Sequence, residues 1–112
     1  MPADKFGAVE LTAGIDRVLM VSRTGYDSTA NIRFINQNSG NRVHVWMYLV
    51  AGDLTTAIGA VTPADALEVE APIGPSDILE DTGIVVPNGH ALVIRSDSDN
   101  VSAIAYGFEE KC

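Results

Sequence analysis

The sequence predicts an all-β domain, built as an antiparallel β-sandwich or jelly roll of about eight short strands. Almost every apolar segment is short, rich in β-branched or aromatic residues, and bounded by Gly, Pro, Asn, Asp or Ser. Such closely spaced strands and turns are typical of sandwiches and jelly rolls. The chain has 112 residues, of which 46% are hydrophobic, so it has the size of one domain and can bury a core without disulfides or metals.

Eight segments carry the strand pattern, and a single segment offers the start of a helix. The expected strands are residues 6–11, 17–22, 29–36, 42–51, 66–71, 84–86, 90–96 and 101–108. Residues 62–70 begin with Thr62 as a helix cap and Pro63 at the first helical position, but they allow only a turn or two. We expect residues 1–14 to be an extended N-terminal arm with the first strand, and residues 15–112 to be a single β-sandwich domain.

Polar turn sequences connect the expected strands. Residues 38–41 (NSGN) and 87–89 (PNG) each lie between two of them, and an Asn-Gly pair favours a tight hairpin. Residues 95–100 (RSDSDN) resemble the start of a calcium loop, because Asp97 and Asp99 alternate. The glycine of such a loop is missing, and Val101 stands where the next ligand is needed. A polar turn that closes the last hairpin is therefore favoured over a weak calcium site.

The expected strand at residues 42–51 is apolar on both faces. Side chains alternate along a strand, so one face carries Val43, Val45, Met47 and Leu49, and the other carries His44, Trp46, Tyr48 and Val50. A second apolar layer of the sandwich explains the face with Trp46, and so does a protein–protein interface, where aromatic anchors are enriched. A carbohydrate platform is a weaker third interpretation, because it rests on a single tryptophan.

The last expected strand, at residues 101–108, has two unlike faces. The large side chains of Ile104, Tyr106 and Phe108 point one way, whereas the small ones of Val101, Ala103, Ala105 and Gly107 point the other way. A face of small residues suits close approach by another backbone.

No catalytic or metal-binding motif is present in the sequence. Neither His44 nor His90 has a second histidine or a carboxylate at a metal-like spacing. Cys112 is the last residue, and a chain terminus is a poor place to hold a nucleophile in fixed geometry. No phosphate-binding glycine loop, G-x-S-x-G elbow or H-E-x-x-H run occurs. We therefore expect a protein that is not an enzyme and that uses no cofactor or metal.

Charge and hydropathy exclude further classes of partner. The net charge is −8 and the seven basic residues are scattered, so the surface repels phosphate backbones and a nucleic-acid partner is not expected. The longest apolar run, residues 45–51, is too short to cross a bilayer, and the first residues lack the pattern of a signal peptide. The lone Cys112 cannot form an internal disulfide. These features predict a soluble protein from a reducing cytoplasm, without a membrane partner.

Three segments carry a resemblance to a known group of proteins. They are KFGAVELTAGIDRVLMV, NIRFINQNSGNRVHVWMYLVAG and ILEDTGIVVPNGHALVIRSDSDNVSAIAYGFEE, and together they cover most of the chain. The first is a short extended arm followed by an early strand, the second is a pair of strands around a tight turn, and the third ends in a Gly-aromatic-Glu step. In this order of strands and turns the chain resembles small β-rich virion structural proteins of tailed bacteriophages, and most of all the head decoration (cement) proteins.

The resemblance implies a non-enzymatic capsid decoration subunit that binds the lattice of the major capsid protein and stabilises the head. Such a subunit is expected to be a homo-oligomer, a trimer or a dimer, on the outer capsid surface of the virion, after assembly in the host cytoplasm. Its candidate interface residues are His44, Trp46 and Tyr48, together with Lys5 and Phe6 in an N-terminal segment that can add a strand to a neighbour's sheet. A phage tail, baseplate or fibre subunit and a carbohydrate-binding β-sandwich module are the alternatives.

Overall fold

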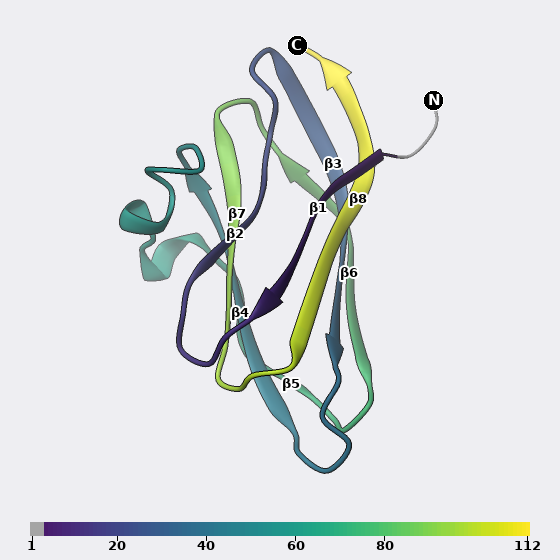
Figure 1. Ribbon diagram of the computed structural model, residues 1–112. Helices are drawn as coiled ribbons and strands as arrows, with labels where there is room; N and C mark the ends of the chain where they lie inside the picture. Colours follow the sequence, from purple (N-terminus) through teal and green to yellow (C-terminus); the bar gives the residue numbers. More distant parts are fainter. Residues whose placement is uncertain (1–3) are drawn as a thin grey trace.

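Two facing four-stranded sheets make up the computed structural model, which describes residues 4–112 (Figure 1). The strands are β1 (Asp4–Leu11), β2 (Arg17–Val21), β3 (Tyr26–Asn36), β4 (Val43–Ala51), β5 (Ala66–Ile73), β6 (Ile78–Val86), β7 (His90–Ser96) and β8 (Val101–Lys111). Two single-turn 3-10 helices, η1 (Ile58–Ala60) and η2 (Pro63–Asp65), lie in the connection between β4 and β5. The start of β1 and the C-terminus lie toward the top of the view in Figure 1.

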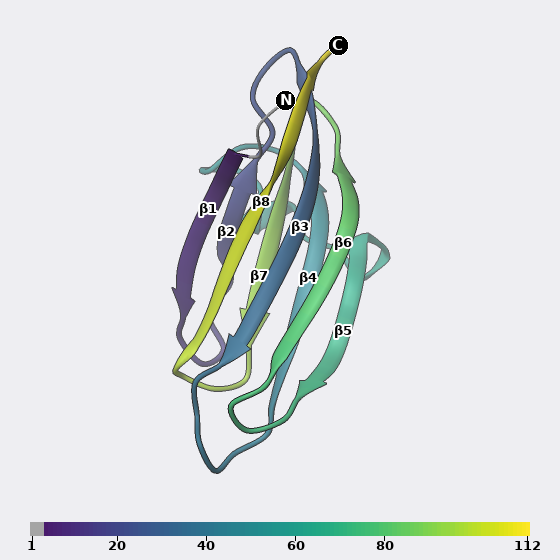
Figure 2. The same cartoon turned by 90° about the vertical axis from the view of Figure 1, so that its right-hand side faces the viewer.

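The order of the strands is that of a jelly roll. Sheet A has the order β1-β8-β3-β6, as Figure 2 shows, and sheet B has the order β2-β7-β4-β5. Every pair of hydrogen-bonded neighbours is antiparallel. Eight strands in two such sheets form the double Greek key of the jelly roll. The predicted all-β, jelly-roll-like class is therefore confirmed.

Most strand boundaries agree with the expected ones, and β6 is the main exception. It begins at Ile78, whereas the sequence pattern placed its start at residue 84. A register shift against β3, opposite Asn31, interrupts the alternation of side chains in its middle, so residues 78–83 do not show a strand pattern. The short helical turn after Thr62 is η2, where the Asp65 carboxylate accepts hydrogen bonds from the backbone N–H (3.2 Å) and the hydroxyl (3.0 Å) of Thr62.

The turns that the sequence marks as hairpins connect the two sheets instead. Residues 38–41, 87–89 and 97–100 each join a strand of one sheet to a strand of the other. The prediction that the RSDSDN segment closes a hairpin is therefore wrong, because β7 belongs to sheet B and β8 to sheet A. Among the eight strands described, only β4 and β5 are both consecutive and hydrogen-bonded. Turn-forming residues allow a chain reversal but do not determine which strand becomes the neighbour.

The expected N-terminal arm is, from residue 4 onward, a strand of this chain's own sheet. Strand β1 pairs with β8 from Asp4 to Leu11, with a register shift at Phe6. The Phe6 side chain packs against the main core, and Lys5 lies opposite Tyr106. This placement corrects the picture of residues 4–8 reaching toward a neighbour, while Met1 to residue 3 lie outside the described residues.

The main core fills the space between the sheets, and a smaller cluster lies on the outer side of sheet B. The largest fully buried side chains of the main core include Phe34, Leu11, Ile32, Met47, Leu92 and Ile94. The smaller cluster consists of Val50, Ala57, Ala91 and Val93. Residues 52–65 pass over this part of sheet B, on the left in Figure 1, and contribute Ala57. One half of the outer face of sheet B is therefore covered by the chain itself.

A fully buried amide, that of Asn36, ties together the connections at one end of the sandwich. Its Nδ2 donates to the carbonyl oxygens of Asn41 (2.7 Å), Ile73 (3.1 Å) and Gly74 (3.0 Å). Its Oδ1 accepts from the backbone N–H (3.0 Å) and the Nδ2 (3.1 Å) of Asn38. All hydrogen-bonding groups of this side chain are satisfied, so its burial stabilises the fold.

Gly107 of β8 lies in close contact with the backbone of β3, its neighbour in the same sheet. A Cβ atom on Gly107 would collide with the carbonyl oxygen of Thr29 on the neighbouring strand β3. We therefore expect Gly107→Ala to lower the free energy of unfolding by about 2 to 3 kcal/mol, because strands at the centre of sheet A must shift. Urea denaturation followed by circular dichroism measures the change. Gly40→Ala is the matched control, because nothing lies within 4 Å of an added Cβ there, and equal losses in both variants would contradict the argument.

Loss of the buried amide at Asn36 is expected to be as severe. Asn36→Ala leaves three carbonyl oxygens without their donor, so we expect the free energy of unfolding to fall by about 2 to 3 kcal/mol. The control is Gln37→Ala, which removes only an exposed hydrogen bond to Ser102. Denaturation curves of the two variants that coincide with the wild-type curve would show that the amide network carries little stability.

Candidate functional site

The candidate interface residues of β4 lie on the outer face of sheet B. His44, Trp46 and Tyr48 are half-buried, whereas the side chains that alternate with them, such as Val45 and Met47, are fully buried between the sheets. The two faces that the sequence pattern assigned to this strand are thus confirmed. Strand β4 is also central in its sheet, between β7 and β5, as an apolar strand is expected to be.

The three outward side chains of β4 have different surroundings. Tyr48 packs against the smaller cluster beneath residues 52–65, so it belongs to the second apolar layer that the sequence offered as one interpretation. Next along the strand, Trp46 lies beside Arg95 of β7, whose guanidinium carbon is 5.9 Å from the centre of the indole ring. This distance allows a cation–π contact. Residues 52–65 thus cover the outer face of sheet B as far as Tyr48, and the uncovered half of that face begins at Trp46.

His44 is held in place by Asp97 of the RSDSDN segment. One carboxylate oxygen accepts the His44 backbone N–H at 2.9 Å, and the other lies 2.9 Å from the ring Nδ1. Partial burial alone would raise the pKa of Asp97, but the hydrogen bonds from His44 and from the Ser98 hydroxyl outweigh it, and the pKa is lowered. Asp97 therefore stays ionised and orients the imidazole.

The other aspartate of the RSDSDN segment points to a different partner. One Asp99 carboxylate oxygen accepts the backbone N–H of Ala13 at 2.9 Å, and its carbonyl oxygen accepts from the Asn38 side chain at 2.9 Å. The two carboxylates thus fasten separate segments, residues 12–16 and β4, to the same connection. This gives the segment a structural role at the end of the sandwich.

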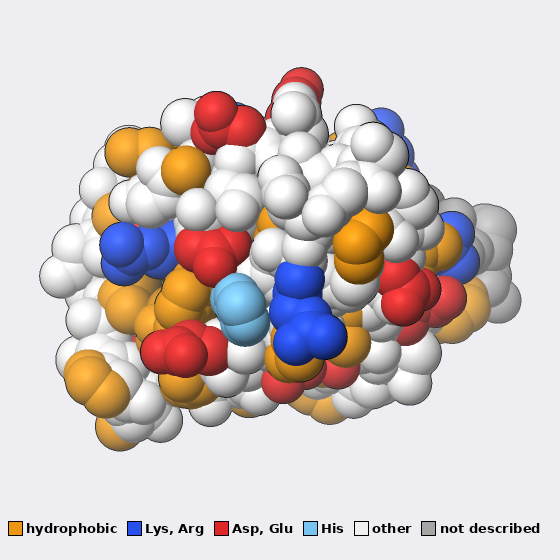
Figure 3. Space-filling model, turned by 90° about the horizontal axis from the view of Figure 1, so that it is seen from below, with side chains coloured by type: hydrophobic (Ala, Val, Ile, Leu, Met, Phe, Trp, Pro, Cys, Tyr) orange, Lys and Arg blue, Asp and Glu red, His pale blue; other side chains and the backbone are white. Residues whose placement is uncertain are grey.

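The end of the sandwich at the bottom of Figure 1 is chemically mixed. Seen from below, side chains of both charges, one histidine and apolar groups share this surface (Figure 3).

Within residues 4–112, no three His, Cys, Asp or Glu side chains are grouped as ligands for a metal ion. Of the described helices, none is long and apolar enough to cross a membrane. Cys112 is exposed, and desolvation together with the nearby Asp27 carboxylate raises the pKa of its thiol.

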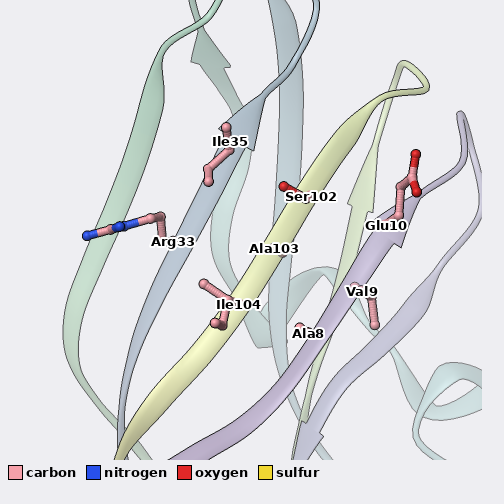
Figure 4. A pocket seen from close by; sticks show the side chains of 8 residues that line it. All are labelled: Ala8, Val9, Glu10, Arg33, Ile35, Ser102, Ala103 and Ile104. Atoms are coloured by element: carbon pink, nitrogen blue, oxygen red, sulfur yellow. The ribbon is translucent and has the colours of Figure 1, made fainter.

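A second surface, on the outer face of sheet A, was only partly visible in the sequence. A shallow hollow of about 380 Å³ lies over β1, β8 and β3 (Figure 4). Ile35, Ser102 and Ile104 stand in its middle, with Arg33 on one side and Glu10 on the other. The alternation in β8 indicated that Ile104 points away from the small inner face. The pairing with β3 that brings Ile35 beside it required the structure.

An inward-pointing carboxyl pair lies where the edge strands β5 and β6 face each other. Glu68 pairs with Met47 and Asp81 with Ile32, and both of these partners point into the core. Burial, and then hydrogen bonding and repulsion from Asp81, raise the pKa of Glu68 to about 7. One Asp81 oxygen is shielded from solvent and has no hydrogen-bond partner. Protonation of Glu68 supplies a donor to this carboxylate, which adds to the effect of burial on the pKa of Glu68.

Comparisons with known proteins identify no family for this chain. No protein-family model matches the sequence, and no curated protein matches it either. One solved structure that matches this chain is that of infectious bursal disease virus, Gx strain. The alignment covers 95% of this chain and 36% of that chain, with 13% sequence identity and a TM-score of 0.43. The chain thus spans about a third of the viral chain that it matches.

The carboxyl pair predicts a decrease of stability with rising pH. The unfolded chain releases the Glu68 proton near the ordinary pKa of 4.5, but the folded chain keeps it up to about pH 7. The contribution of the protonated pair is therefore complete below pH 4.5 and lost as the pH rises through 7. We expect Glu68→Gln to flatten the fall in unfolding free energy across this range, measured by urea denaturation at several pH values.

The matched control for the pH experiment is Glu110→Gln, at an exposed position of β8. Asp97 does not interfere, because its lowered pKa places its titration below 3.8. A wild-type curve without slope between pH 4.5 and 7, or an equal slope in Glu68→Gln, would contradict the assignment.

Proposed function

We propose that the protein is a non-enzymatic structural subunit of a virion, which decorates the capsid by binding the major capsid protein on its outer surface. Its jelly-roll strand order supports this proposal, because the architecture recurs in viral capsid proteins. A fold alone does not define a function, so the proposal rests chiefly on a surface. That surface is the uncovered half of the outer face of sheet B, around Trp46.

The chemistry around Trp46 suits a protein partner. Tryptophan and arginine are the residues most enriched in the energetic centres of interfaces, and Arg95 lies beside the indole. The His44–Asp97 pair adds oriented hydrogen-bonding groups at the rim. A net charge of −8 suits the outer side of a shell, away from nucleic acid. A homo-oligomer that binds several sites of the lattice at once also gains avidity.

Two alternatives share these observations. A tail, baseplate or fibre subunit differs from a decoration subunit only in the partner that the Trp46 surface binds. A carbohydrate-binding module is favoured by the exposed polar groups beside the indole, since jelly rolls also occur in lectins. Against it, the Arg95 side chain lies over the ring and occupies space where a sugar would stack.

Trp46→Ala is expected to weaken capsid binding about 30-fold or more, the effect of an interface centre residue, while the protein stays folded. Co-sedimentation with capsids that lack the protein measures the binding, and circular dichroism checks the fold. Leu54→Ala is the control, because Leu54 is 70% exposed on residues 52–65 and lies outside the proposed surface. Binding of wild-type protein to purified tails but not to capsids would favour the tail alternative.

Retardation of the wild-type protein in polysaccharide gels, abolished by Trp46→Ala, would favour the carbohydrate alternative instead. Capsid binding by Trp46→Ala that equals wild-type binding would contradict the proposed surface. The protein itself is expected to be a homo-oligomer, either a trimer or a dimer.

A further inference from the structure

We propose that two copies of this chain associate in solution through the outer face of sheet A, which packs on the same face of a second copy around a twofold axis. The proposed contact does not depend on what the protein binds, because it uses the sheet opposite to the Trp46 surface. Figure 2 views the molecule toward this sheet, and within the described chain no other segment lies over it.

The outer face of sheet A presents large apolar side chains to solvent. Six large side chains point outward from three of its four strands, β3, β6 and β8, and they are Ile35, Ile78, Val85, Ile104, Tyr106 and Phe108. Ile78, Val85 and Phe108 are 47%, 54% and 43% exposed. Ile78 lies opposite Ile35, Ile104 lies one row further along β8, and Tyr106 and Phe108 follow on the same face of β8, whereas Thr29 separates Val85 from Phe108. Contiguous apolar surface of this kind marks an interaction site.

The area of the face matches the requirement of a stable dimer. Four strands about 4.8 Å apart and about 30 Å long cover about 600 Å². Two such faces therefore bury about 1,200 Å² in total, and side-chain relief adds to this value. Specific interfaces bury roughly 1,200 to 2,000 Å². A sheet face also packs well on another sheet face, since both have the same twist.

The charges of the face favour a second copy despite the acidity of the chain. The centre of the face, around Ile104, contains two cations, Lys5 and Arg33, and two anions, Glu10 and Glu80, whereas Asp27 and Glu110 lie at its end, beyond Phe108. Arg33 and Glu80 form an ion pair at 3.3 Å. The charge of this region is thus balanced, whereas the whole chain has a net charge of −8. Two copies can approach here without the repulsion that other surfaces would produce.

The shape of the face also fits a copy of itself. The small side chains of Ala8 and Ser102 line the hollow together with the larger side chains of Ile35 and Ile104 (Figure 4). A twofold contact places ridges of one face against hollows of the other, as self-complementary interfaces require. Sheet B offers no such flat surface, because residues 52–65 cover half of it.

Charge substitution at the centre of the face provides the test. Ile104 lies on β8, one of the two central strands of sheet A, so a twofold axis brings it near its own copy. Sedimentation equilibrium of the wild-type protein at micromolar concentrations should give twice the chain mass of 11.9 kDa. Ile104→Glu and Ile104→Lys should each give the single chain mass, with unchanged circular dichroism. An equimolar mixture of the two variants should restore the dimer, because opposite charges then meet.

The matched control is Val69→Glu on the outer face of sheet B, where Val69 is 63% exposed. It adds the same charge and should leave the dimer intact. A wild-type protein that is monomeric at these concentrations would overturn the proposal. So would a dimer that persists in Ile104→Glu, or one that Val69→Glu also abolishes. Failure to restore the dimer in the mixed variants would exclude the twofold placement of Ile104. None of these outcomes bears on capsid binding through Trp46.

Discussion

The fold depends on the crossing of the chain between the two sheets, which occurs at every connection but the one from β4 to β5. A crossing connection cannot be secured by the ladder of a hairpin, so its backbone groups need other partners. The buried amide of Asn36 supplies them, because it binds the connections that follow β3 and β5. Asn38 extends this network to the carbonyl oxygen of Asp99, before β8. Three crossings are thus fixed against one another at one end of the sandwich.

This constraint leaves the two outer faces with different surroundings. The connection between β4 and β5 is the exception that stays within one sheet, and it is also the long one, residues 52–65. It passes over sheet B and buries Val50 and Val93 on the outer side. Sheet A has no comparable connection among the described residues, so its apolar side chains stay open to solvent. The same topology therefore explains both outer faces. The outer face of sheet B is covered in one half and uncovered around Trp46, and the outer face of sheet A is uncovered.

The sequence contains the local part of this arrangement and little of the pairing. Period-two alternation assigns Trp46 and Ile104 to the outer faces, because the side-chain direction depends only on position along the strand. The turn at residues 97–100 is equally visible, but its role as a crossing is not, since the same residues serve a hairpin. The start of β6 is hidden by an irregular register. The Glu68–Asp81 pair joins two strands of different sheets, which no local pattern connects.

The edges of the sandwich explain why association is expected through faces. An edge strand exposes unpaired backbone groups, and proteins commonly block them with bulges, prolines and inward-pointing charges. Strand β5 contains Pro72 and a positive φ of 49° at Glu70, and β6 has a register shift and the inward carboxyl of Asp81. Strand β2 has only five residues and is also shifted in register. Edge-to-edge pairing is thus disfavoured on these three strands. The outer face of sheet A presents no unpaired backbone groups, so the proposed contact of two copies through it buries side chains and leaves the edges of the sheets apart.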